Sequence, residues 1–235
     1  MMKKITYLSL VALLMLVGLS ACEKDALVDG GLSNENVNMT TYDFLKSHPK
    51  QMFDTTLMII DKAGMKDLIN SDGTFFVPND YVIANYLAQK QKEARADDER
   101  KNFTLDSLMK FTPQMLRDSM GIYFFKSRIT RDKLNAAGTE FQTSTAGVKL
   151  NVSLEEEDAY QQDGVITTKP KYIYLIKVLG DRDIKQSNGV VGDPSGDDEL
   201  IDIRVLCQTT GIITTTGVVH VLSNSDIWTF KKAID

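Results

Sequence analysis

The stretch TTTGVVHVLSNSDI, residues 214–227, places one of the two histidines of the chain inside a run of valines. Side chains alternate between the faces of a strand, so Val219 and Val221 share one face and His220 has apolar neighbours on the other. Gly217 permits a turn or a close backbone approach before this strand. A buried imidazole without a partner costs about 1–3 kcal/mol, so we expect His220 to hydrogen-bond with backbone or a hydroxyl group. The pattern favours a structural histidine.

A second apolar strand, TFFV at residues 74–77, lies far upstream and is followed by Pro78-Asn79-Asp80. We expect these three residues to end the strand and to cap the next helix. No internal repeat is visible, which predicts one domain. Caps and stops predict further helices over residues 41–48, 51–63 and 113–120, and apolar or alternating runs predict strands within residues 121–129, 147–158, 171–179, 200–206 and 217–222.

These two separated segments carry a pattern that a known family shares. The early one contains Thr74, Phe76, Pro78, Asn79 and Asp80, and the late one Gly217, Val218, Val219, His220, Val221 and Leu222. Together they resemble a fasciclin (FAS1) domain, and residues 127–154 are similar to the family's central segment. Over residues 40–235, the resemblance implies an α+β fold with a two-sheet β wedge and packed helices. It also implies that His220 helps to lock the early segment to the last strand.

The chain departs from the family pattern at several positions. Thr216 replaces an asparagine before the late glycine, and the early segment is one residue short. Ile122-Tyr123-Phe124 stands where the family has a Tyr-His pair. A binding function of the family is therefore not transferred residue by residue.

The N-terminus predicts export and lipidation. Lys3 and Lys4 precede an apolar run that ends in Leu-Ser-Ala-Cys, which predicts a signal peptide over residues 1–21. The four-residue ending resembles the bacterial lipobox, which implies acylation of Cys22 and attachment to a membrane. Residues 22–39 are polar and predict a tether. Glu23 and Asp25 resemble the acidic export signal of Bacteroidetes lipoproteins; an ordinary solvated linker is the alternative.

The net charge argues against a nucleic-acid-binding protein, and the cysteine content argues against an intramolecular disulfide. The formal charge of −5 becomes −7 when the two lysines of the signal peptide are removed, which argues against binding nucleic acid. If Cys22 is acylated, Cys207 has no partner for an intramolecular disulfide. Cys207 continues the apolar phase of the strand before it, which predicts an inward, inert thiol.

The side chains needed for catalysis or metal binding are scarce. Two distant histidines and one remaining cysteine do not make a zinc site, and no Gly-x-Ser-x-Gly segment predicts a serine hydrolase. The polar loop over residues 180–199 could hold calcium through its carboxylates, but a solvated loop is favoured. The acidic run at residues 155–158 is interpreted as a hairpin end. The loop carboxylates in question are Asp193, Asp197, Asp198 and Glu199.

We therefore expect a non-catalytic, lipid-anchored envelope protein that acts in adhesion or binds a protein or glycan partner, with no cofactor or metal. It would lie at the outer membrane, on the cell surface or the periplasmic face. One alternative is an accessory glycan-binding lipoprotein of a polysaccharide-uptake system; others are an inward-facing periplasmic structural protein and a hydrolase. Exposed aromatic residues would favour glycan binding, and the candidates are Tyr160, Tyr172, Tyr174 and Trp228, for which a place in the core is the alternative. Short matches to O-glycosylation sites begin at Asp54, Asp106 and Asp118.

Overall fold

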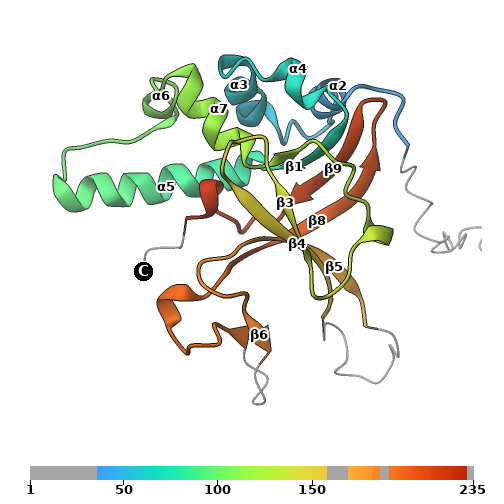
Figure 1. Cartoon of the computed structure of the whole chain (residues 1–235). Helices are drawn as coiled ribbons and strands as arrows, with labels where there is room; N and C mark the ends of the chain where they lie inside the picture. The colour runs from blue at the N-terminus through green and yellow to red at the C-terminus, as the bar shows by residue number, and fades with distance from the viewer. Residues whose placement is uncertain (1–35, 158–168, 186–190, 232–235) are drawn as a thin grey trace, which may run out of the picture. The chain divides into compact units, whose positions relative to one another are not determined.

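The computed structural model describes residues 36–157, 169–185 and 191–231 (Figure 1). The predicted signal peptide, Cys22, Glu23, Asp25 and Tyr160 lie outside the described residues. The helices are α2 (Thr41–Lys46), α3 (Asp54–Lys62), α4 (Lys66–Ile69), α5 (Asp80–Asp97), α6 (Leu105–Leu108) and α7 (Pro113–Gly121). The strands are β1 (Gly73–Val77), β2 (Phe124–Phe125), β3 (Thr139–Gln142), β4 (Lys149–Glu156), β5 (Lys171–Lys177), β6 (Ile184–Lys185), β7 (Val191–Gly192), β8 (Ile203–Ile213) and β9 (Gly217–Leu222).

One seven-stranded sheet, in the order β2-β1-β9-β8-β5-β4-β3, forms the centre of the fold. Strands β1 and β9 are parallel, with Phe76 opposite His220, and the other neighbours are antiparallel. Strands β6 and β7 form a separate ribbon. Both β1 and β9 are buried along their whole length, as expected for a parallel pair inside a sheet.

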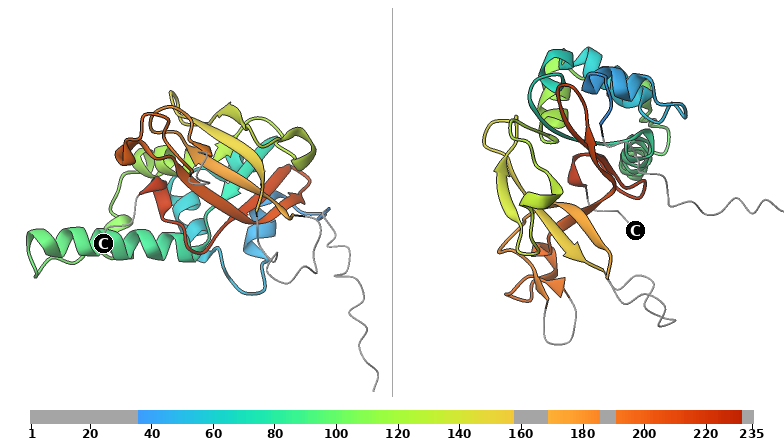
Figure 2. Two further views of the ribbon diagram at one scale, coloured as in Figure 1. Left: turned by 90° about the horizontal axis from the view of Figure 1, so that it is seen from below. Right: turned by 90° about the vertical axis from the view of Figure 1, so that its right-hand side faces the viewer.

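The sheet differs from the expected wedge of two sheets, because β8 belongs to both halves. The first part of this long strand pairs with β5 and the rest pairs with β9, with irregularities after Cys207 and after Thr209. Such irregularities bend a strand. The sheet consequently curls until its edges approach each other: Phe125 of β2 and Phe141 of β3 have ring centroids 6.3 Å apart. Figure 2 shows this curl from two directions.

The helices begin where the sequence predicts caps. The side chains of Thr40, Asn79 and Thr112 accept backbone N–H groups at the starts of α2, α5 and α7. Helices α2, α3, α4 and α7 gather near one end of the sheet, while the charged second half of α5 extends away from it (Figure 1, Figure 2). Among the described residues, no helix is long and apolar enough to cross a bilayer.

The core holds most of the aromatic side chains. The ring of Trp228 is fully buried and meets Tyr86 edge-on at 5.2 Å, while Tyr123 stacks on Phe230 at 5.5 Å. Of the two interpretations of Trp228, the core residue is confirmed and the exposed, glycan-binding aromatic is wrong. The ring of Trp228 packs against α5 within the core.

Some elements differ from the sequence prediction. The strand expected over residues 121–129 shrinks to β2, and α4, α6 and β3 were not predicted. The polar loop contains the β6–β7 ribbon and a short 3-10 helix, Asp198–Leu200. The predicted tether to residue 39 also differs, because Val37 N donates to Ile213 O at 2.8 Å and Thr215 N donates to Met39 O at 2.9 Å. Backbone pairing thus holds residues 37–39 against the end of β8.

Candidate functional site

His220 lies in the middle of the core and is held by backbone groups. Its Nε2 is 2.9 Å from Ile129 O, and its Nδ1 accepts the N–H of Gly211 at 3.2 Å. Because Nδ1 accepts, the proton lies on Nε2, which donates to Ile129 O. The ring stacks on Phe76 with centroids 4.7 Å apart. Burial lowers the pKa of His220 to about 4, against the opposing effect of the bond to Ile129. His220 is therefore a neutral side chain with a structural role.

Thr74 and Asn79 fasten the early segment to its surroundings. Thr74 Oγ1 donates to Ser127 O at 2.7 Å and accepts the N–H of Ile129 at 2.8 Å. Asn79 Nδ2 donates to Leu222 O at 3.0 Å and to the side chain of Asn224 at 2.8 Å. Asn79 Oδ1 meanwhile accepts the first N–H groups of α5. A single side chain thus caps a helix and ties it to the end of β9.

The remaining residues of the two segments also have structural roles. The hydroxyl of Thr56 donates to Pro78 O at 2.6 Å, and Asp80 Oδ1 accepts the N–H groups of Thr55 and Thr56, so Asp80 caps α3. Burial raises the pKa of Asp80, and these N–H groups oppose the rise. A Cβ at Gly217 would lie 2.6 Å from Gly73 O, so the glycine permits close strand contact. Phe76, Val219 and Val221 are buried in β1 and β9.

Neither Cys207 nor His48 lies in surroundings that favour catalysis. Cys207 is buried, and burial raises the pKa of its thiol, so the reactive thiolate is disfavoured. His48 is partly exposed beside the edge of the Phe53 ring. Neither side chain is part of a cluster of three or more His, Cys, Asp or Glu residues that could hold a metal, since the described parts of the chain contain no such cluster.

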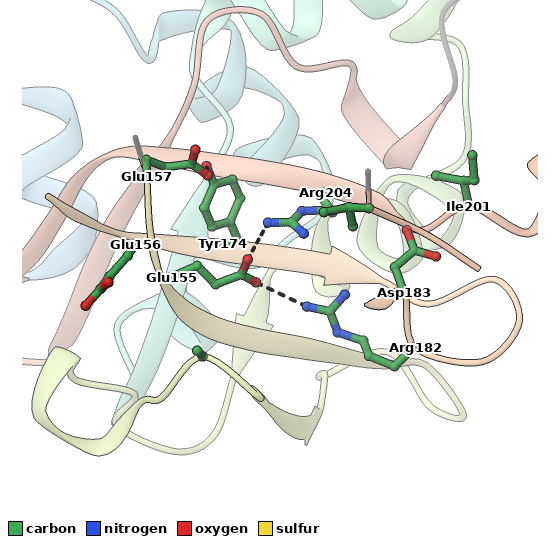
Figure 3. Close-up of a pocket in the computed structure, with 10 residues that line it drawn as sticks. Glu155, Glu156, Glu157, Tyr174, Arg182, Asp183, Ile201 and Arg204 are labelled. Carbon is green, nitrogen blue, oxygen red and sulfur yellow. Dashed lines mark hydrogen bonds and ion pairs between the residues drawn. The ribbon is translucent and has the colours of Figure 1, made fainter. Parts of the chain in front are cut away.

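A cavity of about 610 Å³ opens instead on the other half of the sheet (Figure 3). The register of the strands explains which side chains face it: Ser153 lies opposite Tyr174, and Arg204 lies opposite Ile176, two residues further along β5. Alternation then puts Glu155, Tyr174 and Arg204 on one face. The lining residues are Ala136, Glu155, Glu156, Glu157, Tyr174, Arg182, Asp183, Val191, Ile201 and Arg204.

Glu155 lies between two guanidinium groups at the floor of this cavity. Its Oε1 accepts the hydroxyl of Ser153 at 2.6 Å and Nη2 of Arg182 at 3.2 Å. Its Oε2 accepts Nη2 of Arg204 at 2.6 Å. Arg182 also donates to Asp202 Oδ2 at 2.8 Å through Nη1. Two cations and two anions are thus paired, and this network carries no net charge.

Tyr174 forms one wall of the cavity. Its hydroxyl donates to Glu157 Oε1 at 2.6 Å, and the guanidinium carbon of Arg204 lies 4.7 Å from its ring centroid. Burial, followed by the bond to Glu157, raises the pKa of Tyr174. The phenol therefore stays protonated and keeps Glu157 at the rim.

Two carboxylates hold the loop that carries Arg182. Asp183 Oδ2 accepts the N–H of Asp202 at 3.0 Å, and Asp202 Oδ2 accepts the N–H of Asp183 at 3.0 Å. Asp183 Oδ1 and Arg182 Nε are buried without a hydrogen-bond partner in the protein. Burial raises the pKa of Asp183, and the nearby charge of Asp202 adds to the rise, against the N–H of Asp202.

The loop carboxylates that suggested calcium are used in other ways. Asp193 accepts both the N–H and the hydroxyl of Ser195, which lowers its pKa, and Asp197 Oδ1 accepts the N–H of Glu199 at 2.9 Å. Asp197, Asp198 and Glu199 are not part of any metal-binding group among the described residues. These carboxylates stabilise turns of the loop, and the calcium interpretation gains no support.

The comparisons with known proteins give the family. The family model of the fasciclin domain matches residues 51–192, more than half of the chain. The chain belongs to the fasciclin family. Fasciclin domains are commonly adhesion domains and are generally non-catalytic. The comparison with curated proteins gave no match.

A FAS1 domain pair from the insect cell adhesion molecule fasciclin I is among the similar solved structures. It is 14% identical, with a TM-score of 0.44, over 78% of this chain and 49% of that chain. The present chain thus spans about half the length of that domain pair.

Most of the residues that line the cavity of this fasciclin domain were not predicted from the sequence. Tyr174 was predicted as an aromatic candidate and Glu155 as part of a hairpin end, whereas Arg182 and Arg204 were not predicted. An arginine inside the apolar run LIDIRVL was the available signal, because a charged residue in a strand needs a partner. Tyr172 is partly exposed but does not line the cavity.

Proposed function

We propose that this chain is a lipid-anchored fasciclin domain of the cell envelope that binds a protein or glycan partner and acts in adhesion without catalysis. The family supports the adhesive role. The signal-like residues 1–21, Cys22 and the acidic pair Glu23 and Asp25 support anchoring of the type that Bacteroidetes lipoproteins use. In this proposal the anchor lies in the outer membrane, with the domain at the cell surface.

The observation that carries a binding role is the cavity beside β4, β5 and β8. Its volume of about 610 Å³ is typical of sites for small ligands. Glu155 and Asp202 are both engaged by guanidinium groups, so neither is free to act as an acid or a base. Of the other three carboxylates that line the cavity, Glu156 is paired with Lys171 at 3.2 Å, and Glu157 and Asp183 lie at opposite ends of the cavity (Figure 3). This arrangement favours recognition over hydrolysis.

A second candidate function is glycan binding on behalf of a polysaccharide transporter. Tyr174, an aromatic wall of the cavity, favours it. An inward-facing periplasmic structural protein is a third candidate, and the position of the domain relative to the membrane separates it from the other two.

Protease accessibility tests the position of the domain. Intact cells and lysed cells of the native host are treated with a protease that does not enter the envelope, and the domain is followed with an antibody. Degradation on intact cells is the expected result, while degradation only after lysis would retire surface adhesion. The variant Cys22→Ala is the control for anchoring: it should release the domain from the membrane fraction. Retention of this variant would contradict the lipid anchor.

A further inference from the structure

The cavity beside β4, β5 and β8 has more negative than positive charge to offer a ligand. Its two guanidinium groups are committed to Glu155, within a network that carries no net charge. Glu156 is paired with Lys171 at 3.2 Å, and Asp183 is only 7% exposed. Glu157 remains: among the described residues no cation pairs with it, and it lies partly exposed beside the Tyr174 ring (Figure 3). A bound cation therefore has its counter-charge at Glu157.

Glu157 and Tyr174 form a pair of adjacent acceptors. The Tyr174 hydroxyl donates to Glu157 Oε1 at 2.6 Å, so its proton is used and the phenol oxygen keeps only lone pairs. Burial, followed by the bond to Glu157, raises the pKa of Tyr174, which keeps this hydroxyl protonated at neutral pH. An ionised carboxylate only accepts hydrogen bonds. The two side chains thus select a ligand group that donates and does not accept.

We propose that this end of the cavity binds the ammonium group of a lysine side chain from a protein partner. An ammonium group has three donors and no acceptor, so it can donate to the carboxylate of Glu157 and to the phenol oxygen of Tyr174 together. The stem of a lysine side chain is apolar, and the Tyr174 ring and Ala136 supply apolar lining for it. This inference rests on the proposed binding function and names the ligand group of the same site.

Other ligand groups meet a penalty at this pair. An anion would be repelled by Glu157, and it would have to displace Glu155 from both guanidinium groups. A hydroxyl group or a sugar ring oxygen would bring lone pairs toward Glu157 and Tyr174, which have no donor left for them. The guanidinium group of an arginine suits two free oxygens of one carboxylate, and one oxygen of Glu157 already accepts from Tyr174. The compact ammonium group therefore fits best.

Calorimetric titration of the full chain with short peptides tests the ligand group. The probe is a blocked pentapeptide with one lysine among alanines, and the comparison peptides have acetyl-lysine, glutamate or arginine in its place. We expect the lysine peptide to bind, the acetyl-lysine and glutamate peptides to bind at least about ten-fold more weakly, and the arginine peptide to bind more weakly than the lysine peptide. No measurable binding of the lysine peptide, or equal binding of any comparison peptide, overturns the proposal.

Two pairs of variants locate the lysine site. E157Q keeps an oxygen for the Tyr174 hydroxyl but removes the charge, so it should weaken binding at least about ten-fold, whereas E99Q changes an exposed glutamate outside the cavity and should bind normally. Ala136 and Ala137 are both exposed, but Ala137 does not line the cavity, so A136W should block binding and A137W should not. Normal binding by E157Q or by A136W would show that the lysine binds elsewhere and overturn the proposal.

Adhesion of cells that carry A136W separates this inference from the proposed function. Loss of lysine binding with unchanged adhesion would retain the lysine site and refute its adhesive use. Loss of adhesion in A136W, for a chain that binds no lysine peptide, would overturn the lysine site and retain the adhesive role of the cavity.

Discussion

Asp226 is the side chain whose replacement has the most pH-dependent consequence. Its Oδ2 is buried without a hydrogen-bond partner in the protein. Burial raises the pKa of Asp226 to about 7, although a backbone hydrogen bond with Ser223 opposes the rise. The unfolded chain releases this proton near pH 3.9, so the native state binds more protons between about pH 4 and pH 7. The contribution of Asp226 to stability is complete below about pH 4 and is lost as the pH rises to 7.

The size of the change in the free energy of unfolding follows from the pKa shift of Asp226. At about 1.4 kcal/mol per pH unit, a shift of about three units corresponds to about 4 kcal/mol. His220 acts in the opposite direction: its pKa falls to about 4, so its contribution is present above about pH 6.5 and is lost as the pH falls to 4. The two slopes oppose each other between pH 4 and 6.5, so the contributions of Asp226 and His220 largely cancel there.

The variant Asp226→Asn separates the contribution of Asp226 to stability from that of His220. Asparagine has nearly the shape of the protonated carboxyl group, so the variant should match the wild type near pH 4 and exceed its free energy of unfolding by about 4 kcal/mol at pH 8. Urea unfolding at intervals from pH 4 to pH 8 measures the difference. Asp72→Asn, an exposed position, is the control and should give a flat difference. A flat difference for Asp226→Asn as well would refute the reasoning, because it would mean that the carboxylate is already ionised and solvated in the native state.

Three further predictions concern the core. Asn79→Ala should lower the free energy of unfolding by about 2–4 kcal/mol, because it removes a helix cap and two bonds to the end of β9, whereas Thr112→Ala removes a cap alone and should cost about 1 kcal/mol in the same urea titration. Gly217→Ala should lower the free energy of unfolding by about 1–3 kcal/mol, because the new Cβ would clash with Gly73 O. The urea concentration at the midpoint of unfolding should fall, and an unchanged midpoint would contradict the close contact. Cys207 should react with a thiol reagent only when the chain unfolds, and rapid labelling of the native protein would show that the thiol is accessible.

The elements that the sequence predicts well are those with local causes. Asn79 follows Pro78, and Thr112 precedes Pro113, so the start of each helix is encoded within a few residues. The partners of strands are not local. Nothing near residues 73–77 indicates that they lie beside residues 217–221, and only the family resemblance suggested that these segments meet. The single curled sheet was missed because it depends on β8 pairing on both sides.

The cavity was harder to predict than the fold, for a related reason. Glu155, Tyr174 and Arg204 come from three strands, and only the register of β4, β5 and β8 brings them onto one face. A shift of one residue in any strand would turn its side chain to the other face. Arg182 and Asp183 come from a loop whose path depends on Asp202, so no pattern within that loop predicts the site.

The position of β9 has a consequence for how the chain is made. The last strand lies between β1 and β8, and its partner in β1 is 144 positions earlier in the sequence. Until residues 217–222 have left the ribosome, the sheet lacks an inner strand, and contacts of such long range form slowly. The sheet therefore cannot be completed until the chain is almost fully synthesised. In the proposal that residues 1–21 are an export signal, this delay leaves time for the chain to reach a translocation channel that passes only unfolded polypeptide.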